Sequence, residues 1–430
     1  MKRALLFIFA GSAVAVAGQS ADGNQGDTSQ TPPASFFASH HISGSTRLDY
    51  SSSSKQLDDA RDFWGGTAQI KWLAALTDKL DAKIESRLSA ADLRDGKTNS
   101  RLLEAYLTLR FDQTDLRIGK QIVAWGRADG VNPTDNLTPH DYTTLLPFEE
   151  DQRFGTFALK INRYLTSEQT LSVFATPYFE PSKFPQAPMN NINLTEKRPA
   201  RTPGNTELGV KLDNSGSGFD WSVSYFHGYS LTPEMRIAEP LQRMPTVEIH
   251  YPGIDVLGAD MARNFGRYGV RAEFAYIRPH DVSSANNAGI KPYLFYVLGV
   301  DCTFWDNLNI NLQLIGRHVQ NPAQRDASSD PLILNISFQN ALSFGQEKRD
   351  NYGISSRISE KWLNDALEAE VLIFANFSQR DSYLRPLLSY ALSDQMKISV
   401  GAEIYRGPAD SYFGRLKKNS RMFGELRYNF

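Results

Sequence analysis

Charged and hydrogen-bonding side chains of both signs gather in one stretch of the chain, 116–156. Opposite charges that face each other across a water-filled passage create a transverse field, and such a field can sort charged solutes. We therefore take eight residues here as candidate pore and selectivity residues: Arg117, Gln121, Trp125, Arg127, Asp129, Asp135, Asp151 and Arg153.

The same stretch predicts a strand followed by an unusually long loop. Residues 116–126 alternate between apolar and polar side chains, as a β-strand does. The following polar segment contains Gly130, Asn132-Pro133 and Thr138-Pro139, which are typical of turns. Its length of about 28 residues exceeds that of ordinary connections, and its aromatic residues argue against disorder. We predict an ordered loop over 126–154 that folds inward; the alternative is a solvated surface loop.

Catalytic and metal-binding motifs are not evident in the sequence. None of the seven histidines lies in a G-x-S-x-G or an H-E-x-x-H motif, and the carboxylates of the long loop do not have EF-hand spacing. We therefore predict no metal site, no cofactor and no enzymatic activity. A Ser–His pair formed between neighbouring strands would leave no mark in the sequence spacing, so a barrel hydrolase remains a less favoured alternative.

The elements that must position the long loop are amphipathic strands. Segments of about ten residues alternate apolar and polar side chains at 101–111, 267–277, 307–318 and 395–406. In the first of them the apolar face consists of Leu103, Ala105, Leu107, Leu109 and Phe111. In the third and fourth, Leu312 and Val400 are assigned to the apolar face, while Gln313 and Lys397 are assigned to the polar one.

Three features favour a transmembrane barrel over a soluble sandwich. The strands have the length of tilted membrane strands. Short turns alternate with long connections, as in outer-membrane barrels. Tryptophans lie near strand ends, which suits interfacial girdles; these are Trp64, Trp125, Trp221, Trp305 and Trp362. We predict an all-β fold, a transmembrane antiparallel β-barrel of 16–18 strands with 18 as the best count, in which residues 331–343 belong to a loop.

The N-terminus predicts export. Lys2 and Arg3 precede a short apolar run that ends at Ala15-Val16-Ala17, the pattern of a cleaved signal peptide over 1–17. A flexible leader is expected over 18–41 and the barrel over 42–430. The net charge of the whole chain is −2, which gives no reason to expect a nucleic-acid partner. The single cysteine, Cys302, excludes an internal disulfide.

The last ten residues, 421–430, place a hydrophobic residue at every second position and end on phenylalanine. This resembles the C-terminal assembly signal of Gram-negative outer-membrane β-barrel proteins. The resemblance implies insertion by the barrel-assembly machinery, with Tyr428 and Phe430 as assembly residues. The segment RIGKQIVAWG at 117–126 also resembles a strand of porin-like outer-membrane families, among which are alginate-export and phosphate-selective porins.

Together these patterns predict a porin-like outer-membrane channel for small polar solutes, with selectivity from the loop 126–154. The expected partners are outer-membrane lipid, lipopolysaccharide, the barrel-assembly machinery and a small-molecule solute, with a homo-trimer as one compatible assembly. The alternatives are a structural or export barrel for surface polysaccharide and the barrel hydrolase.

Overall fold

The computed structural model describes residues 40–53, 62–143, 152–184, 192–216, 218–239, 245–281, 289–305, 307–322 and 330–430. The predicted signal peptide lies outside these residues. The predicted leader lies outside them too, except for His40 and His41, which already belong to the first strand.

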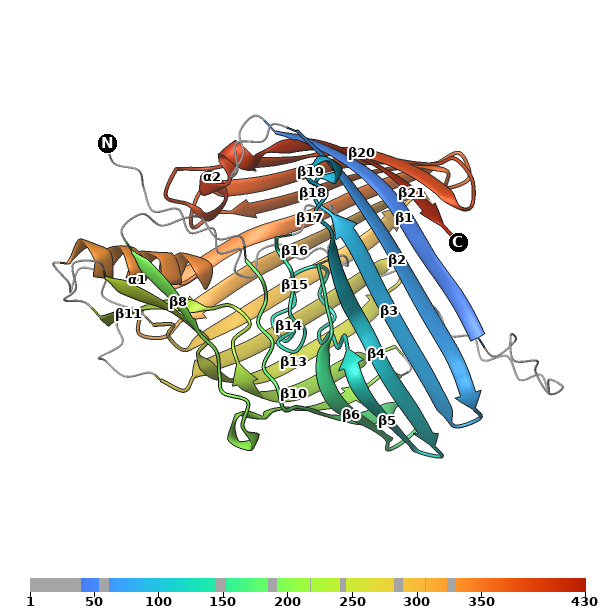
Figure 1. Cartoon of the computed structure of the whole chain (residues 1–430), viewed down its shortest axis with the longest axis horizontal. Coiled ribbons are helices and arrows are strands. Elements are labelled where there is room, and N and C mark those ends of the chain that lie inside the picture. The colour runs from blue at the N-terminus through green and yellow to red at the C-terminus, as the bar shows by residue number, and fades with distance from the viewer. Residues whose placement is uncertain are drawn as a thin grey trace.

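Eighteen antiparallel strands form one closed sheet, which agrees with the predicted fold class and with the best strand count (Figure 1). Each strand pairs with its neighbour in the barrel, and β1 pairs with β21 to close it. The wall strands are β1 (His40–Ser53), β2 (Asp62–Thr77), β3 (Leu80–Ala90), β4 (Asn99–Phe111), β5 (Thr114–Gln121), β6 (Thr156–Tyr164), β7 (Gln169–Thr176), β9 (Glu207–Asn214), β10 (Asp220–Tyr229), β13 (Gly253–Phe265), β14 (Tyr268–Pro279), β15 (Tyr293–Phe304), β16 (Leu308–Val319), β17 (Asp350–Trp362), β18 (Leu367–Asn376), β19 (Asp381–Ala391), β20 (Met396–Arg406) and β21 (Arg421–Asn429).

The two faces of the sheet reverse the usual pattern of a soluble protein. Large apolar side chains stay exposed on the outside, as Leu312 does at 44% and Val400 at 50%, whereas Gln313 on the inside is 1% exposed. Exposed apolar side chains around a closed sheet are what a lipid-facing barrel requires. The predicted assignment of these three residues to the two faces is therefore confirmed.

One predicted face is wrong at the start of β4. Leu103 is 3% exposed, whereas its neighbour Leu102 is 43% exposed. The cause is a β-bulge: Glu85 pairs with Glu104 and Ser86 with Leu102, so Leu103 has no partner in the register. An extra residue in one strand reverses the facing of the residues on one side of it.

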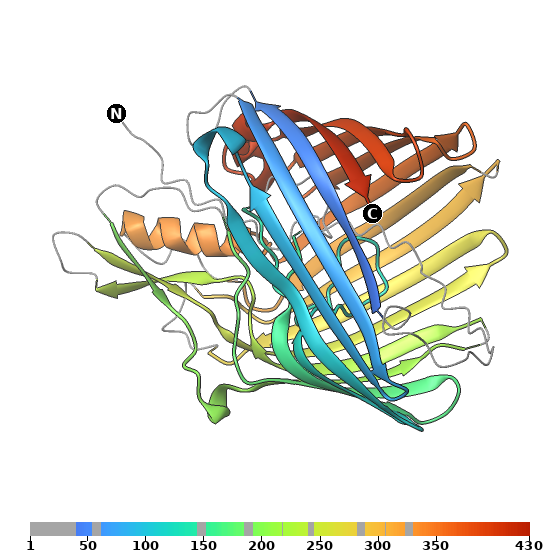
Figure 2. The ribbon, with the colours of Figure 1, turned by 45° about the vertical axis from the view of Figure 1, so that its right-hand side comes forward.

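The connections differ between the two ends of the barrel. Tight turns and the C-terminus lie at one end, on the right in Figure 1, while the long connections lie at the other. There β8 (Asn193–Lys197), β11 (Glu234–Glu239) and β12 (Thr246–His250) form a separate small sheet. The helix α1 (Pro331–Ser343) lies beside it (Figure 2). This segment belongs to the connection between β16 and β17 and not to the wall, as predicted, but it is helical. We call these four elements the cap.

The cap is fixed by side chains from connections far apart in sequence. The amide of Asn340 in α1 binds the backbone of Met235 in β11 with both its ends, accepting at 2.8 Å and donating at 2.9 Å. An apolar cluster of Phe184, Met235, Val247 and Ile336 lies beneath it. A second short helix, α2 (Tyr412–Arg415), buries Phe413 against β19 and β20.

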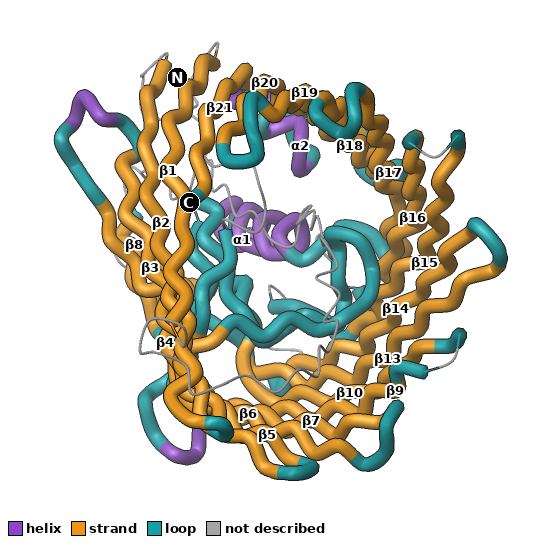
Figure 3. Tube along the Cα trace, turned by 90° about the vertical axis from the view of Figure 1, so that its right-hand side faces the viewer, coloured by secondary structure: helices purple, strands orange, loops and turns teal. Residues whose placement is uncertain are grey.

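The described residues of the connection between β5 and β6, 122–143 and 152–155, lie inside the barrel (Figure 3). Side chains of this connection contact the inner wall.

No helix among the described residues is long and apolar enough to cross a membrane.

Candidate functional site

The strand that begins the site is shorter than predicted. β5 ends at Gln121 rather than continuing to Gly126. Beyond it Val123 leaves the sheet, and its backbone N–H and carbonyl are both bound by the hydroxyl of Thr138, at 2.8 and 2.6 Å. These contacts bring the two ends of residues 123–138 together, and we call this segment the inner lobe.

The inner lobe is held to the wall by one buried carboxylate. Glu273 of β14 is fully buried and accepts backbone N–H groups from Arg127, Ala128 and Thr134, at 3.1, 3.1 and 2.8 Å. The hydroxyl of Thr134 donates to it as well, at 2.8 Å. A carboxylate with several donors is a strong anchor, because charge-assisted hydrogen bonds are stronger than neutral ones.

Gly126 makes this approach possible. Its φ is +101°, a left-handed conformation that favours glycine. A Cβ at this position would lie 2.5 Å from a carboxylate oxygen of Glu273. Gly126 is thus needed both for the turn and for the contact with the wall.

Trp125 corrects a prediction. It is 4% exposed and packs inside the barrel with Phe174 and Phe226, so it does not belong to an interfacial girdle. Gly209 of β9 provides the space, because a Cβ there would lie 2.8 Å from the indole ring. The alternation of residues 116–126 misled the assignment because the chain leaves the sheet after Gln121.

Two charged residues of the inner lobe reach different parts of the wall. Arg127 forms ion pairs with Asp260 of β13 and with Asp213 of β9, the latter at 3.0 Å. Asp129 lies 3.5 Å from a guanidinium nitrogen of Arg357 on β17. Burial raises the pKa of Asp129 above its usual value, although the nearby Arg357 acts in the opposite direction. The lobe therefore spans the lumen between these strands.

Residues 139–143 and 152–155, which we call the returning arm, contact both the inner lobe and strand β4 of the wall. Arg153 pairs with Asp135 at 2.5 Å, and Arg101 of β4 pairs with Asp141 at 2.5 Å. His140 forms a backbone bridge with Arg153. Burial, reinforced by the charge of Arg153, lowers the pKa of His140 to about 3, so its imidazole is neutral at ordinary pH.

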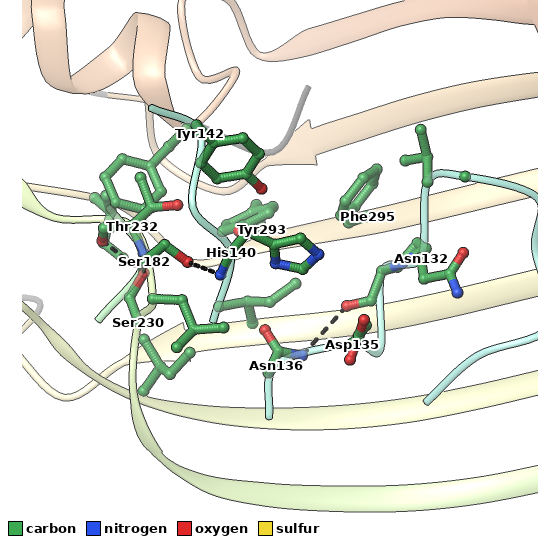
Figure 4. A pocket seen from close by; sticks show the side chains of 18 of the residues that line it. Asn132, Asp135, Asn136, His140, Tyr142, Ser182, Ser230, Thr232, Tyr293 and Phe295 are labelled. Carbon is green, nitrogen blue, oxygen red and sulfur yellow. Dashed lines mark hydrogen bonds between the residues drawn. The ribbon is translucent and has the colours of Figure 1, made fainter. Parts of the chain in front are cut away.

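A cavity of about 130 Å³ lies between the inner lobe, the returning arm and the wall (Figure 4). Its lining combines polar groups with aromatic rings. Asp135, Asn136 and His140 come from the loop, and Tyr293 and Phe295 come from β15.

Two further predicted site residues, Arg117 and Gln121, lie apart from this cavity. Arg117 is on the inner face of β5, where it stacks over Tyr106 at 4.3 Å and donates to Thr108 at 3.2 Å. Gln121 is fully buried and donates to the carbonyl of Ala158 at 2.9 Å, which indicates a structural contact. Asp151 lies outside the described residues. The structure thus brings Trp125, Arg127, Asp129, Asp135 and Arg153 into one unit.

The other side of the lumen carries charges that pair along the wall. Arg385 pairs with Glu370 at 2.9 Å and Arg421 with Glu403 at 2.6 Å, while Lys83 lies 2.9 Å from Glu85. We call the strands β18–β21 and β1–β4 the charged arc. Strands β7, β9, β10 and β13–β16, against which the inner lobe packs, are called the anchor arc. β17 separates them, and its Arg357 contacts both Asp129 and, at 3.6 Å, Glu370.

The wall partners of the inner lobe were missed by sequence reasoning. Glu273, Asp260, Asp213 and Arg357 each occupy a polar position in an alternating strand, like many other residues. One signal could have pointed to this part of the wall: the carboxylates of Asp260 and Glu273 lie directly opposite each other on neighbouring strands. This pairing can be recognised only when the strand register is known.

The fold resembles those of solved bacterial proteins, one of which is described as an outer membrane protein. OccD3 (OpdP) of Pseudomonas aeruginosa matches with a TM-score of 0.54 and 11% identity over 91% of this chain and 90% of that chain. The outer membrane protein OpdK of the same organism matches with a TM-score of 0.55 and 11% identity over 91% and 98%. OccAB2 of Acinetobacter baumannii matches with a TM-score of 0.55 and 10% identity over 93% and 99%. At these identities the likeness establishes the fold.

The sequence has no match among curated proteins. Residues 12–408 match the family described as "Protein of unknown function (DUF1302)". Because the match covers most of the chain, this protein belongs to the DUF1302 family.

Proposed function

We propose that this chain is an outer-membrane channel for the diffusion of small polar solutes, in which the inner lobe narrows the passage and sets its selectivity. One observation carries the proposal: a loop segment rich in charges is fixed inside the lumen through Glu273, Asp260, Asp213 and Arg357. Burying charged side chains of the wall is costly unless they are paired. Their pairing with the inner lobe therefore supports a fixed position of this segment in the lumen.

The size of the barrel supports a passage. Barrels of 16–18 strands enclose an aqueous channel, and this one has eighteen. The passage would run between the inner lobe and the charged arc, where paired charges of both signs line the wall. Solutes moving there would meet a field set by a few residues.

Solved structures with a similar fold support the proposal that the solute is a small molecule. One relative is the outer membrane protein OpdK, and one of its structures is of OpdK with vanillate. Placement in the outer membrane, contact with lipopolysaccharide and assembly by the barrel-assembly machinery follow from the same proposal. A homo-trimer stays a prediction.

Planar-bilayer recording tests the proposal directly. The variant replaces residues 124–137 with a short glycine linker, which the closure of Val123 on Thr138 allows without strain on the barrel. We expect the variant to fold and its single-channel conductance to rise severalfold, because the narrowing segment is gone. A glycine replacement of Leu93–Asp95, an exposed turn between β3 and β4, is the matched control and leaves conductance unchanged.

Two outcomes would contradict the proposal in different ways. Equal conductance of the variant and the parent would show that the inner lobe lies outside the passage. No conductance in either would favour the alternative, a structural or export barrel with a closed lumen.

A further inference from the structure

Two histidines and an aspartate meet on the outer surface of the barrel, away from the inner lobe. His227 lies on β10, Asp255 on β13, and His280 directly follows β14. Nδ1 of His227 is 2.8 Å from Oδ1 of Asp255, and Nε2 of His280 is 3.3 Å from Oδ2 of the same carboxylate. One ligand atom from each of the three residues can be chosen so that all lie within 4.8 Å of one another.

The strand register brings these residues together. His227 is directly opposite Asp255, and the backbone N–H of His280 donates to the carbonyl of Gly253 at 2.9 Å. Asp255 shares its face with Leu257, which is 58% exposed on the outside of the barrel. All three residues therefore lie on the outer face at the loop end of adjacent strands.

The surroundings of the cluster fix its geometry. A Cβ at Gly253 would lie 2.3 Å from Nδ1 of His280, so the imidazole occupies space that only a glycine leaves free. The imidazole of His280 stacks on that of His227 with ring centroids 4.9 Å apart. The hydroxyl of Tyr225 donates to Asp255 at 2.7 Å and orients the carboxylate.

We propose that His227, Asp255 and His280 form a binding site for a divalent transition-metal ion, with Zn²⁺ as the best fit. Imidazole nitrogen and carboxylate oxygen are ordinary zinc ligands, and bond lengths near 2.0–2.1 Å place the ligands of a tetrahedral ion about 3.3 Å apart. Nδ1 of His227 lies 2.8 Å from one oxygen of Asp255 and Nε2 of His280 lies 3.3 Å from the other, so each pair taken separately is close to this spacing.

The cluster also resembles a metal site in its access and support. The side chains of His227, Asp255 and His280 are 45%, 33% and 40% exposed, so an ion can enter and a fourth position stays open to water. A hydroxyl that holds a ligating carboxylate, as Tyr225 does, is a common support for bound metals.

A bound ion would tie three wall strands at the base of the cap. The connection between β10 and β13 contains β11 and β12, and it begins and ends beside His227 and Asp255. Metal binding adds stability to the state that presents the ligands together. The proposal does not depend on whether the barrel conducts solutes.

The test uses the whole folded barrel in detergent after removal of metals with a chelator. Zn²⁺ is titrated by calorimetry, and Co²⁺ is added as a spectroscopic probe whose visible absorption reports coordination number. We expect one site per chain and a tetrahedral Co²⁺ spectrum that Zn²⁺ abolishes. Absence of a stoichiometric site in the parent protein would overturn the proposal and leave a hydrogen-bonded His–Asp–His cluster.

Variants locate the site. His280→Gln removes one ligand and should weaken Zn²⁺ binding more than tenfold. Gly253→Ala keeps all three ligands but displaces the imidazole of His280, so it should weaken binding as well. Tyr225→Phe should weaken binding by about 10-fold or more, the range for lost support of a ligand. Heat-modifiable mobility in gels confirms that each variant is folded.

The matched control is His318→Gln. His318 also lies at the end of a wall strand and pairs with an aspartate, Asp350, at 2.6 Å, but it belongs to no three-ligand group among the described residues. Its substitution should leave the affinity unchanged. Equal affinities of His280→Gln and the parent would place the metal elsewhere and overturn the assignment.

Discussion

The anchor arc and the charged arc are built from strands with the same alternating pattern, yet they use their inner side chains in opposite ways. In the anchor arc, Glu273 accepts hydrogen bonds from the inner lobe, and Val256 and Ile277 pack against apolar residues of the lobe. In the charged arc, Arg385 and Arg421 pair with carboxylates of neighbouring strands. One side of the lumen therefore holds a loop, and the other presents paired charges along the wall.

This contrast between the arcs indicates where the proposed passage would lie. Apolar packing and buried backbone donors fix the inner lobe in place because leaving such donors unpaired is costly. Cross-strand ion pairs satisfy each other and need no loop to cover them. The anchor arc thus holds the lobe, whereas the charged arc would line the proposed passage, so variants can alter one arc without the other.

The largest expected effect concerns the seam of the barrel, which lies in the charged arc. Phe430 pairs with Gly44 through both backbone groups, at 2.9 and 3.0 Å, and its ring covers the position where Gly44 has no side chain. Deletion of Phe430 should abolish the folded barrel, because it removes the last closing pair and the aromatic end of the predicted assembly signal. The measurement is heat-modifiable mobility together with protease resistance of outer-membrane fractions.

A tryptophan at position 430 is the control for that deletion. Phe430→Trp keeps an aromatic terminus and should assemble. Normal assembly of the deletion would show that closure depends on the remaining register of β1 and β21 alone.

The next largest effect on conductance is expected from a change in the anchor arc, and it can be compared with a change in the cap. Glu273→Ala leaves the N–H groups of Arg127, Ala128 and Thr134 without their acceptor. At about 1–3 kcal/mol for a buried donor left unpaired, the inner lobe should detach from the wall. We expect higher and noisier single-channel conductance and new trypsin cleavage after Arg127.

Asn340→Ala is the matched control for this change. It breaks two hydrogen bonds between α1 and β11, but it does so in the cap. Its conductance should stay near that of the parent. If Glu273→Ala and Asn340→Ala have the same conductance, the anchor arc does not control the passage more than the cap does.

A smaller effect concerns the charge of the inner lobe. Arg127→Ala leaves Asp213 and Asp260 without their common cation, so the passage becomes more negative. We expect a shift of ion preference towards cations, measured as the reversal potential in a KCl gradient. Arg198→Ala removes the same charge from an exposed pair with Glu196 and should leave the reversal potential unchanged. An equal shift in both variants would mean that net charge alone, rather than position, sets selectivity.

The sequence predicted the wall well because a barrel strand has a simple pattern. Alternation places Leu312 outside and Gln313 inside without any knowledge of the neighbours. Deviations arise where the backbone departs from ideal pairing, as at the bulge of Leu103 and where the chain leaves the sheet before Trp125.

The site was harder to predict because its contacts join distant segments. The loop residues Arg127 and Asp129 could be recognised from composition, but Glu273 and Arg357 lie more than a hundred residues away. Their pairing depends on a lumen that exists only after the barrel closes. The cap was missed for the same reason, since β8, β11 and β12 come from two connections.

The smallest expected effect lies where the two arcs meet. Asp129 of the inner lobe contacts Arg357, which in turn contacts Glu370 of the charged arc. Asp129→Asn removes one negative charge here and should shift ion preference slightly towards anions.

Because burial raises the pKa of Asp129, acidification should neutralise it before ordinary aspartates and shift the ion preference of the parent protein in the same direction. Reversal potentials recorded from neutral to acidic pH measure both changes. The early part of the pH-dependent shift should be missing in Asp129→Asn. If the parent and the variant respond alike to acid, another carboxylate titrates first, and Asp129 is not the junction between the arcs.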